Sequence, residues 1–476
     1  MEQERKTNRF LEFFKYKEKG ATLSGDLIGG LVTFLAMCYI LPVNSSILSS
    51  MGMDAMGVFA STAIVSALVT MLMGLFANAP IALSAGMGLN AFLAYTVCGS
   101  LGYSWQESML LLTITGIVFF AFSLTPIRKK IIAAFPKDLK CIISAGLGAF
   151  IAFVGLKGSG IITSDGSTFV KLGSLSSPSV ILAIVGIFVV LALMFIKTKK
   201  GLLSSLAVPI SMLAIAIIGY IMRIAGVNDP NLPNVDLQSG WGINGYQNVF
   251  FYGVLAEETN FSDIGNMLVN VLSKPGTYAV IFSLIFVNLF DTTATLMAVG
   301  RDTGVTDSNG DLKNNRAIIA DAVGALVCAP LGTATVTSFA ESTVGVKSGA
   351  RTGLASLLTG SLFLISAFVY PLFQLFTAPC VSAAALVSVG ALIFASNLGE
   401  INWKEPEISF SAFITVIFIV LTYSLTNGIG FGLFAYIVIS LARGKWKGIS
   451  WILYLVAVFY LASFAVNEIV SAMAAK

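Results

Sequence analysis

The stretch Gly332-Thr-Ala-Thr-Val-Thr-Ser-Phe-Ala-Glu-Ser342 interrupts a chain that otherwise consists of long apolar runs. Its alternating β-branched residues favour a short extended strand, which should be followed by a half-helix beginning near Glu341. The first half has the same order: Pro80 precedes a short segment, Ile81–Ala85, and a second half-helix should begin at Gly86-Met-Gly-Leu-Asn90. Irregular backbone at membrane depth persists only where it faces protein or a cavity. The paired broken segments therefore predict a binding site between them.

The composition is that of a membrane protein. The chain has 476 residues, of which 56% are hydrophobic and only 11% are charged, whereas a soluble domain carries about 25% charged residues. Four apolar runs, at 27–48, 57–77, 178–196 and 202–222, are as long as a bilayer core requires. The sequence therefore predicts an all-α polytopic membrane protein, in which two short broken segments carry brief strands.

Several classes of protein are excluded by what the sequence lacks. It contains no histidine, which rules out HExxH metalloproteases and Ser-His intramembrane proteases. The five cysteines form no CxxC pair and lie in apolar runs, so they are expected to be packing residues. We therefore expect no metal, no cofactor and no enzymatic activity.

The distribution of charge predicts the topology. Most of the 28 lysines and arginines fall in the N-terminal segment and in alternate loops, whereas the segment 226–275 is acidic. The positive-inside rule then places the N-terminal segment in the cytoplasm, where we expect a solvated tail. The loops alternate properly only if the broken segments 78–98 and 331–346 each cross the membrane.

A weak internal duplication accompanies this topology. Gly74-Leu-Phe-Ala-Asn-Ala-Pro80 resembles Gly324-Ala-Leu-Val-Cys-Ala-Pro330, and two further matches follow in the same order: Thr115-Gly116 with Thr359-Gly360, and Gly148–Ile151 with Gly390–Ile393. If each half has seven spans, the second half enters from the opposite side, which gives an inverted repeat of about 14 membrane segments. The apolar run Ile449–Val466 is then left over, as a further span or as a surface-lying helix.

Two carboxylates lie deep in apolar sequence. Asp291 and Glu341 have no basic residue in their spans, although a carboxylate at the bilayer centre costs at least roughly 2.5–3.5 kcal/mol. Each carboxylate either has a structural role, in which it caps a helix or bonds a neighbouring Ser or Thr, or it binds solute, a coupling ion, or both. Asp321, near the end of its predicted span, is expected to be structural. Asn90 either forms a hydrogen bond between helices or binds a planar polar ligand through its amide.

Four motifs carry a resemblance to a known family. They are Gly86-Met-Gly-Leu-Asn-Ala-Phe92, Leu289-Phe-Asp-Thr-Thr-Ala-Thr-Leu296, the opening stretch Gly332–Ser342, and Gly349-Ala-Arg-Thr-Gly353. Over nearly the whole chain the sequence resembles the guanine/hypoxanthine/adenine permeases, which belong to the nucleobase–cation symporters related to nucleobase–ascorbate transporters. It departs from the family at Ala294 and Ala334, where other members often carry Gly or Ser, and these departures affect specificity more than class.

The resemblance implies a fold and an activity. It implies two intertwined seven-segment repeats, with segments one to four and eight to eleven in a core domain and the remainder in a gate domain. It also implies proton-coupled purine uptake across the plasma membrane by an elevator-like movement, often as a homodimer. The implied partners are a purine nucleobase, protons and the lipid bilayer, with no nucleic acid.

The resemblance also assigns roles to site residues. Asp291 matches the family's carboxylate in segment eight, and Glu341 matches its carboxylate in segment ten. The resemblance implies that both take part in substrate binding and proton coupling. Asn90 lies in segment three and is implied in substrate binding. The starts of the half-helices would offer backbone N–H groups and an aromatic wall, from Ala85, Gly86, Met87, Phe339 and Ala340. An ionised Glu341 can accept two N–H groups from guanine, as acidic residues accept from base edges elsewhere.

On this reading the chain divides into six parts: the cytoplasmic segment 1–25, core 26–135, gate 136–225, an extracellular loop 226–276, core 277–375, and gate with C-terminus 376–476. Other solutes remain open on the same architecture, including uracil, xanthine, urate and anions such as sulfate. An anion carrier would favour a cation where Glu341 lies. A channel is a further alternative, but it would need a continuous polar pore.

Overall fold

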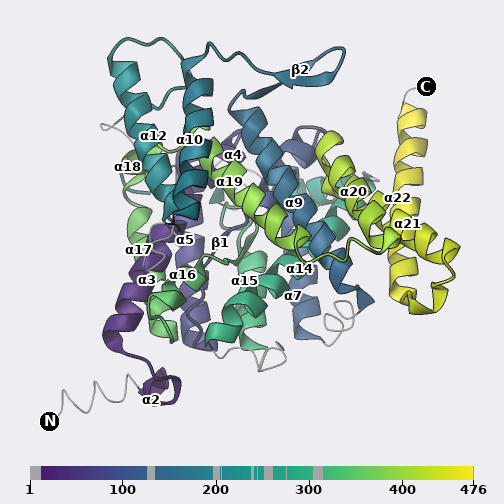
Figure 1. The fold of residues 1–476 in the computed structure, drawn as a ribbon, viewed down its shortest axis with the longest axis horizontal. Helices are drawn as coiled ribbons and strands as arrows, with labels where there is room; N and C mark the ends of the chain where they lie inside the picture. The colour runs from purple at the N-terminus through teal and green to yellow at the C-terminus, as the bar shows by residue number, and fades with distance from the viewer. Residues whose placement is uncertain are drawn as a thin grey trace.

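The computed structural model describes residues 12–125, 134–196, 204, 206–236, 241–243, 245–250, 261–274, 276–303 and 315–474. Most of them are helical, as predicted, and the helices form a bundle with α2 at the lower left and the end of α22 at the upper right (Figure 1).

The first half begins with the short helix α2 (Tyr16–Lys19). It continues with α3 (Leu23–Met37), α4 (Ile40–Ser49), α5 (Ala55–Leu72), the π-helix η1 (Met73–Ala77), β1 (Leu83–Ala85), α6 (Met87–Ala91), the π-helix η2 (Phe92–Cys98) and α7 (Trp105–Leu124). Then follow α9 (Lys137–Gly158), the hairpin β2 (Ile162–Asp165) and β3 (Phe169–Leu172), α10 (Pro178–Phe195) and α12 (Ala207–Ile224).

The second half is preceded by a 3-10 turn, η3 (Tyr246–Asn248), and by α13 (Phe261–Ser273). It comprises α14 (Gly276–Thr303), α15 (Arg316–Val327), β4 (Val336–Ser338), α16 (Ser342–Lys347), α17 (Gly353–Ser366), α18 (Tyr370–Gln374), α19 (Pro379–Leu398), α20 (Pro406–Leu421), α21 (Leu425–Ala442), the 3-10 turn η5 (Trp446–Gly448) and α22 (Trp451–Ala474).

Several helices begin where the sequence supplies an N-cap. The Thr22 hydroxyl accepts a hydrogen bond from the backbone of the first turn of α3, and the Asp54 carboxylate does the same for α5. Ser104 and Glu107 form a reciprocal capping box at the start of α7. These caps satisfy N–H groups that would otherwise be unpaired at helix ends.

The two predicted brief strands pair with each other. β1 and β4 are antiparallel, with Leu83 opposite Ser338 and Ala85 opposite Val336. All six strand residues are buried, so the pair lies inside the bundle and not at its surface. Each strand satisfies the backbone polar groups of the other, which is the condition for irregular backbone at membrane depth.

Glycines that match in the two halves of the sequence meet in the structure. A Cβ added at Gly148 would lie 2.6 Å from the Gly390 carbonyl oxygen, and one added at Gly390 would lie 2.5 Å from the Gly148 oxygen. This reciprocal contact lets α9 and α19 form the most extensive helix packing among the described elements. Reciprocity of this kind is expected of two structurally repeated halves.

Eight apolar helical segments of the described residues are long enough to cross a membrane by length and composition, counting α3 with α4 and α5 with η1 as one segment each, and several shorter apolar helices accompany them. The number of 14 segments therefore remains a prediction. The run left over by the repeat, Ile449–Val466, falls mainly in α22, which packs against α14 through Tyr460, whose hydroxyl lies 3.2 Å from that of Ser283.

The N-terminal segment differs from the solvated tail that the sequence predicted. Phe14 is fully buried, and the Tyr16 hydroxyl donates a 2.6 Å hydrogen bond to the buried carboxylate of Asp26. The Asn78 side chain donates to the Phe14 carbonyl and accepts from the backbone N–H of Gly353. The expectation was wrong for Phe14 and Tyr16, because aromatic side chains alternate with charged ones there and are buried, whereas Phe13, Lys15, Lys17 and Glu18 are exposed.

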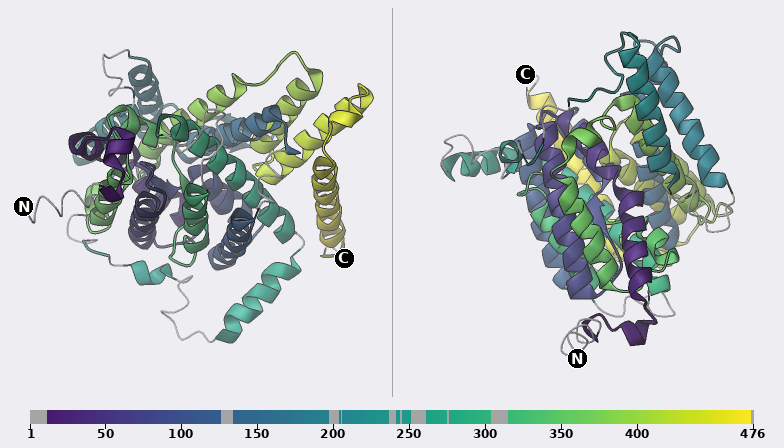
Figure 2. Two further views of the ribbon diagram at one scale, coloured as in Figure 1. Left: turned by 90° about the horizontal axis from the view of Figure 1, so that it is seen from below. Right: turned by 90° about the vertical axis from the view of Figure 1, so that its left-hand side faces the viewer.

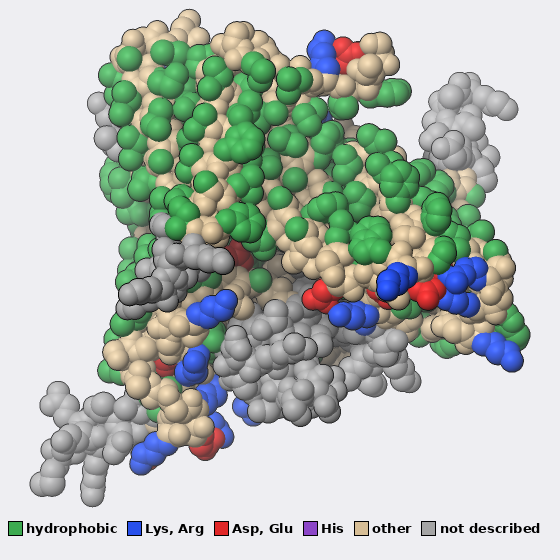
Figure 3. Space-filling view, in the orientation of Figure 1, with side chains coloured by type: hydrophobic (Ala, Val, Ile, Leu, Met, Phe, Trp, Pro, Cys, Tyr) green, Lys and Arg blue, Asp and Glu red, His purple; other side chains and the backbone are tan. Residues whose placement is uncertain are grey.

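The views show how the elements are grouped. α10 and α12 stand at the top left beside α9 and α19, whereas α3, α16, α17, α15 and α7 reach further down (Figure 1). α13 projects from the side of the bundle in two views (Figure 2). Hydrophobic side chains cover α10 and α12, and lysines and arginines gather towards the lower side (Figure 3).

Candidate functional site

The strand pair brings the two half-helices together at their starts. The backbone N–H of Gly86 donates to the Thr335 carbonyl at 2.7 Å, and that of Phe339 donates to the Ala82 carbonyl at 3.0 Å. α6 therefore begins at Met87 and α16 at Ser342, close to the positions that the sequence predicted. Their axes leave the strand pair in opposite senses, because the strands are antiparallel.

The predicted wall residues lie at this junction with different exposure. Ala85, Gly86, Met87 and Phe339 are buried, whereas Ala340 is exposed. The exposed position is next to Glu341, which is half-buried and precedes α16 as its N-cap residue. A ligand approaching Ala340 would therefore meet the Glu341 carboxylate.

Glu341 is held by a residue that sequence reasoning did not single out. The Tyr39 hydroxyl donates a 3.0 Å hydrogen bond to Glu341 Oε1, across 302 positions of sequence. Tyr39 itself is only 4% exposed. Its contact occupies one carboxylate oxygen and orients the group, because a charge-assisted hydrogen bond has a strong geometric preference.

A break in the first span places Tyr39. α3 ends at Met37 and α4 begins at Ile40, and Pro42 follows in the first turn of α4. Proline has no N–H to donate to the carbonyl four residues earlier, which interrupts regular helix at that point. The resulting break turns the Tyr39 side chain into the bundle, where it reaches Glu341.

Asn90 lies in a separate buried polar network. Its Nδ2 donates to Asn44 Oδ1 at 2.7 Å, and Asn44 Nδ2 in turn donates to the hydroxyls of Thr62 and Thr333. The network joins α6 to α4, α5 and the approach to β4. Asn90 Oδ1 is a buried acceptor with no partner among the described residues. Such an atom has capacity for one N–H of a ligand.

Asp291 falls within α14, but its side chain lies outside the described residues. The next residue, Thr292, is fully buried and donates a 2.7 Å hydrogen bond to Asp321 Oδ2. Its hydroxyl also lies 3.1 Å from that of Thr337 in β4. This part of α14 is therefore fixed beside the strand pair.

Asp321 links α14 to β4 through hydrogen bonds. Its Oδ1 accepts from the backbone N–H and the hydroxyl of Ser338, at 2.8 and 2.7 Å, and it is fully buried. The sequence placed it near the end of a span, but it lies in the middle of α15. The prediction of its position was wrong because α15 is short and ends at Val327, before Pro330. Its contacts fit the structural role that was expected.

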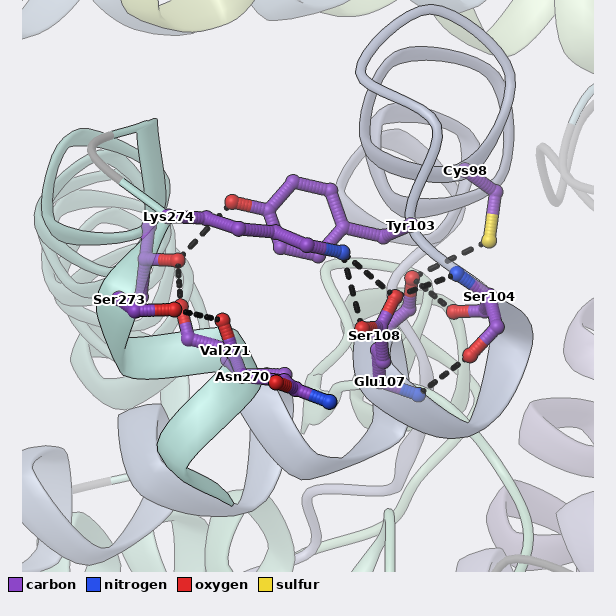
Figure 4. A network of polar contacts seen from close by, with 10 residues as sticks. Cys98, Tyr103, Ser104, Glu107, Ser108, Asn270, Val271, Ser273 and Lys274 are labelled. Carbon is purple, nitrogen blue, oxygen red and sulfur yellow. Dashed lines mark hydrogen bonds and ion pairs between the residues drawn. The ribbon is translucent and has the colours of Figure 1, made fainter. Parts of the chain in front are cut away.

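The outer contacts of α14 form a second polar cluster (Figure 4). Lys274 Nζ forms an ion pair with both Glu107 oxygens, at 2.8 and 2.9 Å, and lies 4.3 Å from the centre of the Tyr103 ring. The Tyr103 hydroxyl lies 2.9 Å from that of Thr277. These contacts hold the start of α14 to the start of α7.

Sequence reasoning missed Tyr39, Asn44 and the buried Asp26, which accepts from the backbone N–H groups of Arg351 and Thr352. A signal was present, since Asn44 is a polar residue two positions after a proline in an apolar run. Among the described residues, no group of three or more Cys, Asp or Glu side chains could hold a metal ion.

Two broken segments that meet at a buried strand pair, inside a bundle of apolar helices, define the chain as a membrane permease. The chain belongs to the permease family, whose profile matches residues 25–431. It is 38% identical to the guanine/hypoxanthine permease PbuG of Bacillus subtilis, over 95% of this chain and 98% of the relative. It is 34% identical to the adenine permease AdeQ of Escherichia coli, over 94% of each chain.

Solved structures show the same fold at low identity. The transmembrane domain of a cyanobacterial bicarbonate transporter, BicA, is 16% identical with a TM-score of 0.58, over 87% of this chain and 97% of that chain. The murine anion transporter Slc26a9 is 13% identical with a TM-score of 0.58, over 89% of this chain and 69% of that chain. The resemblance to purine permeases is thus confirmed, and the relatives are permeases and not enzymes.

Proposed function

We propose that the protein imports purine nucleobases together with protons, favouring guanine and hypoxanthine and accepting adenine less well. The observation that carries the proposal is the half-buried Glu341 carboxylate at the start of α16, oriented by Tyr39 and beside the exposed Ala340. The names of the relatives, guanine/hypoxanthine and adenine permeases, support the substrate class.

The proposed binding mode uses the edge of the base. Guanine presents N1–H and its 2-amino group side by side, and a carboxylate presents two acceptors. Because Tyr39 donates to Oε1, the purine would share that oxygen or use Oε2. Asn90 Oδ1, which has no described partner, would accept a further N–H. The backbone N–H of Met87 and the Phe339 ring would complete the site, whereas the N–H groups of Gly86 and Phe339 already donate to the opposite strand.

Asp291 and Glu341 are the proposed proton-coupling pair. A carboxyl group at membrane depth is costly to ionise without a partner, so it can bind and release a proton as the site opens to either side. The absence of histidine from the sequence leaves carboxylates as the natural carriers. Asp321, in contrast, already accepts several hydrogen bonds from its neighbours.

An elevator-type movement is supported by the packing of the helices. α17 packs chiefly with α3 and α5, and α15 with α7, whereas α19 packs with both α9 and α10, and α20 packs with α21. The first set belongs to the proposed core, 26–135 and 277–375, and the second to the proposed gate, 136–225 and 376–476. Movement between these sets would carry the site across the membrane.

We further propose a plasma-membrane location with residues 1–25 in the cytoplasm and 226–276 outside. The lysines and arginines on the lower side of the molecule support this orientation (Figure 3). The bilayer is then the surrounding medium, and a homodimer is the proposed assembly.

Three alternatives are compared with the site. A small-anion carrier is one alternative, because solved bicarbonate and anion transporters share the fold. A carrier of another nucleobase is the second. A carboxylate at the half-helix disfavours an anion, since like charges repel. A channel is disfavoured because the polar groups of the site are localised around the strand pair.

The test is uptake by reconstituted vesicles. Unlabelled guanine, hypoxanthine, adenine, uracil, xanthine, urate, sulfate and bicarbonate would compete with labelled hypoxanthine. Guanine should compete best, a protonophore should abolish accumulation, and removal of sodium should not. Hypoxanthine counterflow would separate a carrier from a channel. Accumulation that persists without a pH gradient or membrane potential would rule out proton coupling.

A further inference from the structure

An apolar crevice lies between the first span and α12. It has a volume of about 250 Å³ and is lined by Leu35 and Tyr39 on one side, by Ile210 and Leu213 on the other, and by Phe373 of α18. The apolar span Leu23–Ser49, which contains α3 and Tyr39, and α12 are each long enough to cross a membrane, so the crevice lies at bilayer depth. A purine site, by contrast, would need polar groups.

The polar atoms of the lining are already used. The Tyr39 hydroxyl donates to Glu341, and Cys38 Sγ donates to the Leu35 carbonyl at 3.5 Å. A cavity without free polar groups does not retain water. An unfilled space of this size would forfeit dispersion contacts along all its walls. The chemistry of the lining therefore fits a flexible hydrocarbon.

The crevice opens towards the surface that faces lipid. Leu35 and Ile210 are each 39% exposed, and Leu213 is 48% exposed. Deeper in the crevice, Met212 is fully buried and Tyr39 nearly so. Side chains that are exposed on membrane-spanning helices contact acyl chains, so hydrocarbon is present at the mouth.

We propose that an acyl chain of a membrane lipid occupies this crevice and packs against the Tyr39 ring. Tyr39 then contacts both the proposed purine site and the lipid, since its hydroxyl bonds Glu341 while the carbon face of its ring contacts the acyl chain. One wall comes from α3 of the proposed core and the other from α12 of the proposed gate. The consequence for transport rests on the proposed function: the acyl chain would lie between the core and the gate, which move relative to each other.

Photolabelling tests the occupant directly. The full chain would be reconstituted in phosphatidylcholine carrying a diazirine midway along one acyl chain, irradiated, and digested for mass spectrometry. Label should appear on Met212 or Tyr39 as well as on Ile217, which is 46% exposed on the same helix and does not line the crevice. Label on Ile217 without label on Met212 or Tyr39 would overturn the proposal.

Matched variants sharpen the test. Leu213→Trp fills the mouth and should remove label from Met212 and Tyr39 while Ile217 stays labelled. Ile217→Trp places the same bulk one turn away and should leave Met212 labelled. Leu213→Ala widens the mouth and should raise the labelling of Met212, which keeps the test valid if the tryptophan variant does not fold.

Two other outcomes count against the proposal. Unchanged Met212 labelling in Leu213→Trp would mean that the label arrives by another route. A second copy of the protein would cover the mouth if Leu35, Ile210 and Leu213 are protected from label and if that protection is lost when the protein is diluted in lipid. Hypoxanthine counterflow is measured in parallel: its absence from the wild type would refute the proposed function and leave the lipid site standing.

Discussion

The Tyr39 hydroxyl donates to Glu341 Oε1 at 3.0 Å, although the two residues lie in opposite halves of the sequence. The contact links the break between α3 and α4 to the start of α16. It sets both the direction of the carboxylate and the number of its oxygens that stay free for a ligand. In this arrangement Tyr39 is a positioning residue for the proposed purine site.

Tyr39→Phe should weaken guanine binding. The change removes the hydrogen bond that orients the carboxylate before the base binds, so up to its roughly 1.5–3 kcal/mol is lost as pre-organisation and the Kd should rise by up to about one to two orders of magnitude. Isothermal titration on purified protein measures it. Tyr454→Phe, which removes a hydroxyl from α22 outside the site, is the control and should keep the wild-type Kd. Equal Kd values for Tyr39→Phe and wild type would contradict the positioning role.

Glu341→Gln should change the selectivity among purines. An amide can donate as well as accept, so it suits adenine, which presents an acceptor at N1 beside its 6-amino donor. Guanine would lose a matched acceptor at a cost of roughly 1–3 kcal/mol. Titrations should therefore show weaker guanine binding and unchanged or stronger adenine binding. Equal losses for both bases would mean that Glu341 supports the site without reading the edge of the base.

Asp291→Asn should uncouple transport from the proton gradient. The amide keeps the size and hydrogen bonding of the carboxylate but cannot ionise. Vesicles should still exchange labelled hypoxanthine for unlabelled hypoxanthine, while accumulation driven by a pH gradient should fall severely. Asp165→Asn, in the β2–β3 hairpin, is the matched control and should accumulate normally. Wild-type accumulation by Asp291→Asn at normal expression would reject the assignment.

Asp321→Asn should destabilise the fold. The carboxylate accepts from Thr292, from the Ser338 backbone and from the Ser338 hydroxyl, whereas an amide keeps one acceptor oxygen and places an NH2 group where the other oxygen accepted. A buried polar group left unpaired costs roughly 1–3 kcal/mol. Thermal unfolding in detergent should show a lower Tm for the variant than for the wild type, and the difference should be the same with and without substrate. An unchanged Tm would indicate that these contacts do not hold β4.

The sequence predicted the elements of the site better than their partners. The β-branched run before Glu341 and the proline-ended segment before Gly86 were sufficient to predict two strands and two half-helices, because local chemistry decides those features. Tyr39 could not be predicted as the partner of Glu341. Their contact depends on how the first span breaks and on how the two halves pack, and neither is local.

The same distinction explains the two errors. A segment rich in lysine was expected to be solvated, but burial of Phe14 and the Tyr16–Asp26 hydrogen bond depends on a surface built by the start of α17. Asp321 was placed near the end of a span, because local sequence does not show that the apolar run forms only a short helix. α15 has 12 residues, and the carboxylate lies in its middle.

Gly390→Ala should disturb the contact between α9 and α19. A Cβ there would lie 2.5 Å from the Gly148 oxygen and 2.6 Å from the Ala152 nitrogen, both backbone atoms that cannot rotate away. Overpacking of this kind costs typically about 1–3 kcal/mol, so the Tm should fall. Gly158→Ala is the control, because a Cβ at the end of α9 meets no atom within 4 Å. In the proposed elevator both helices belong to the gate, so purine affinity should change little while counterflow slows. A lower Tm with a normal counterflow rate would support the contact between α9 and α19 but contradict its role in transport. A normal Tm would contradict the importance of the contact itself.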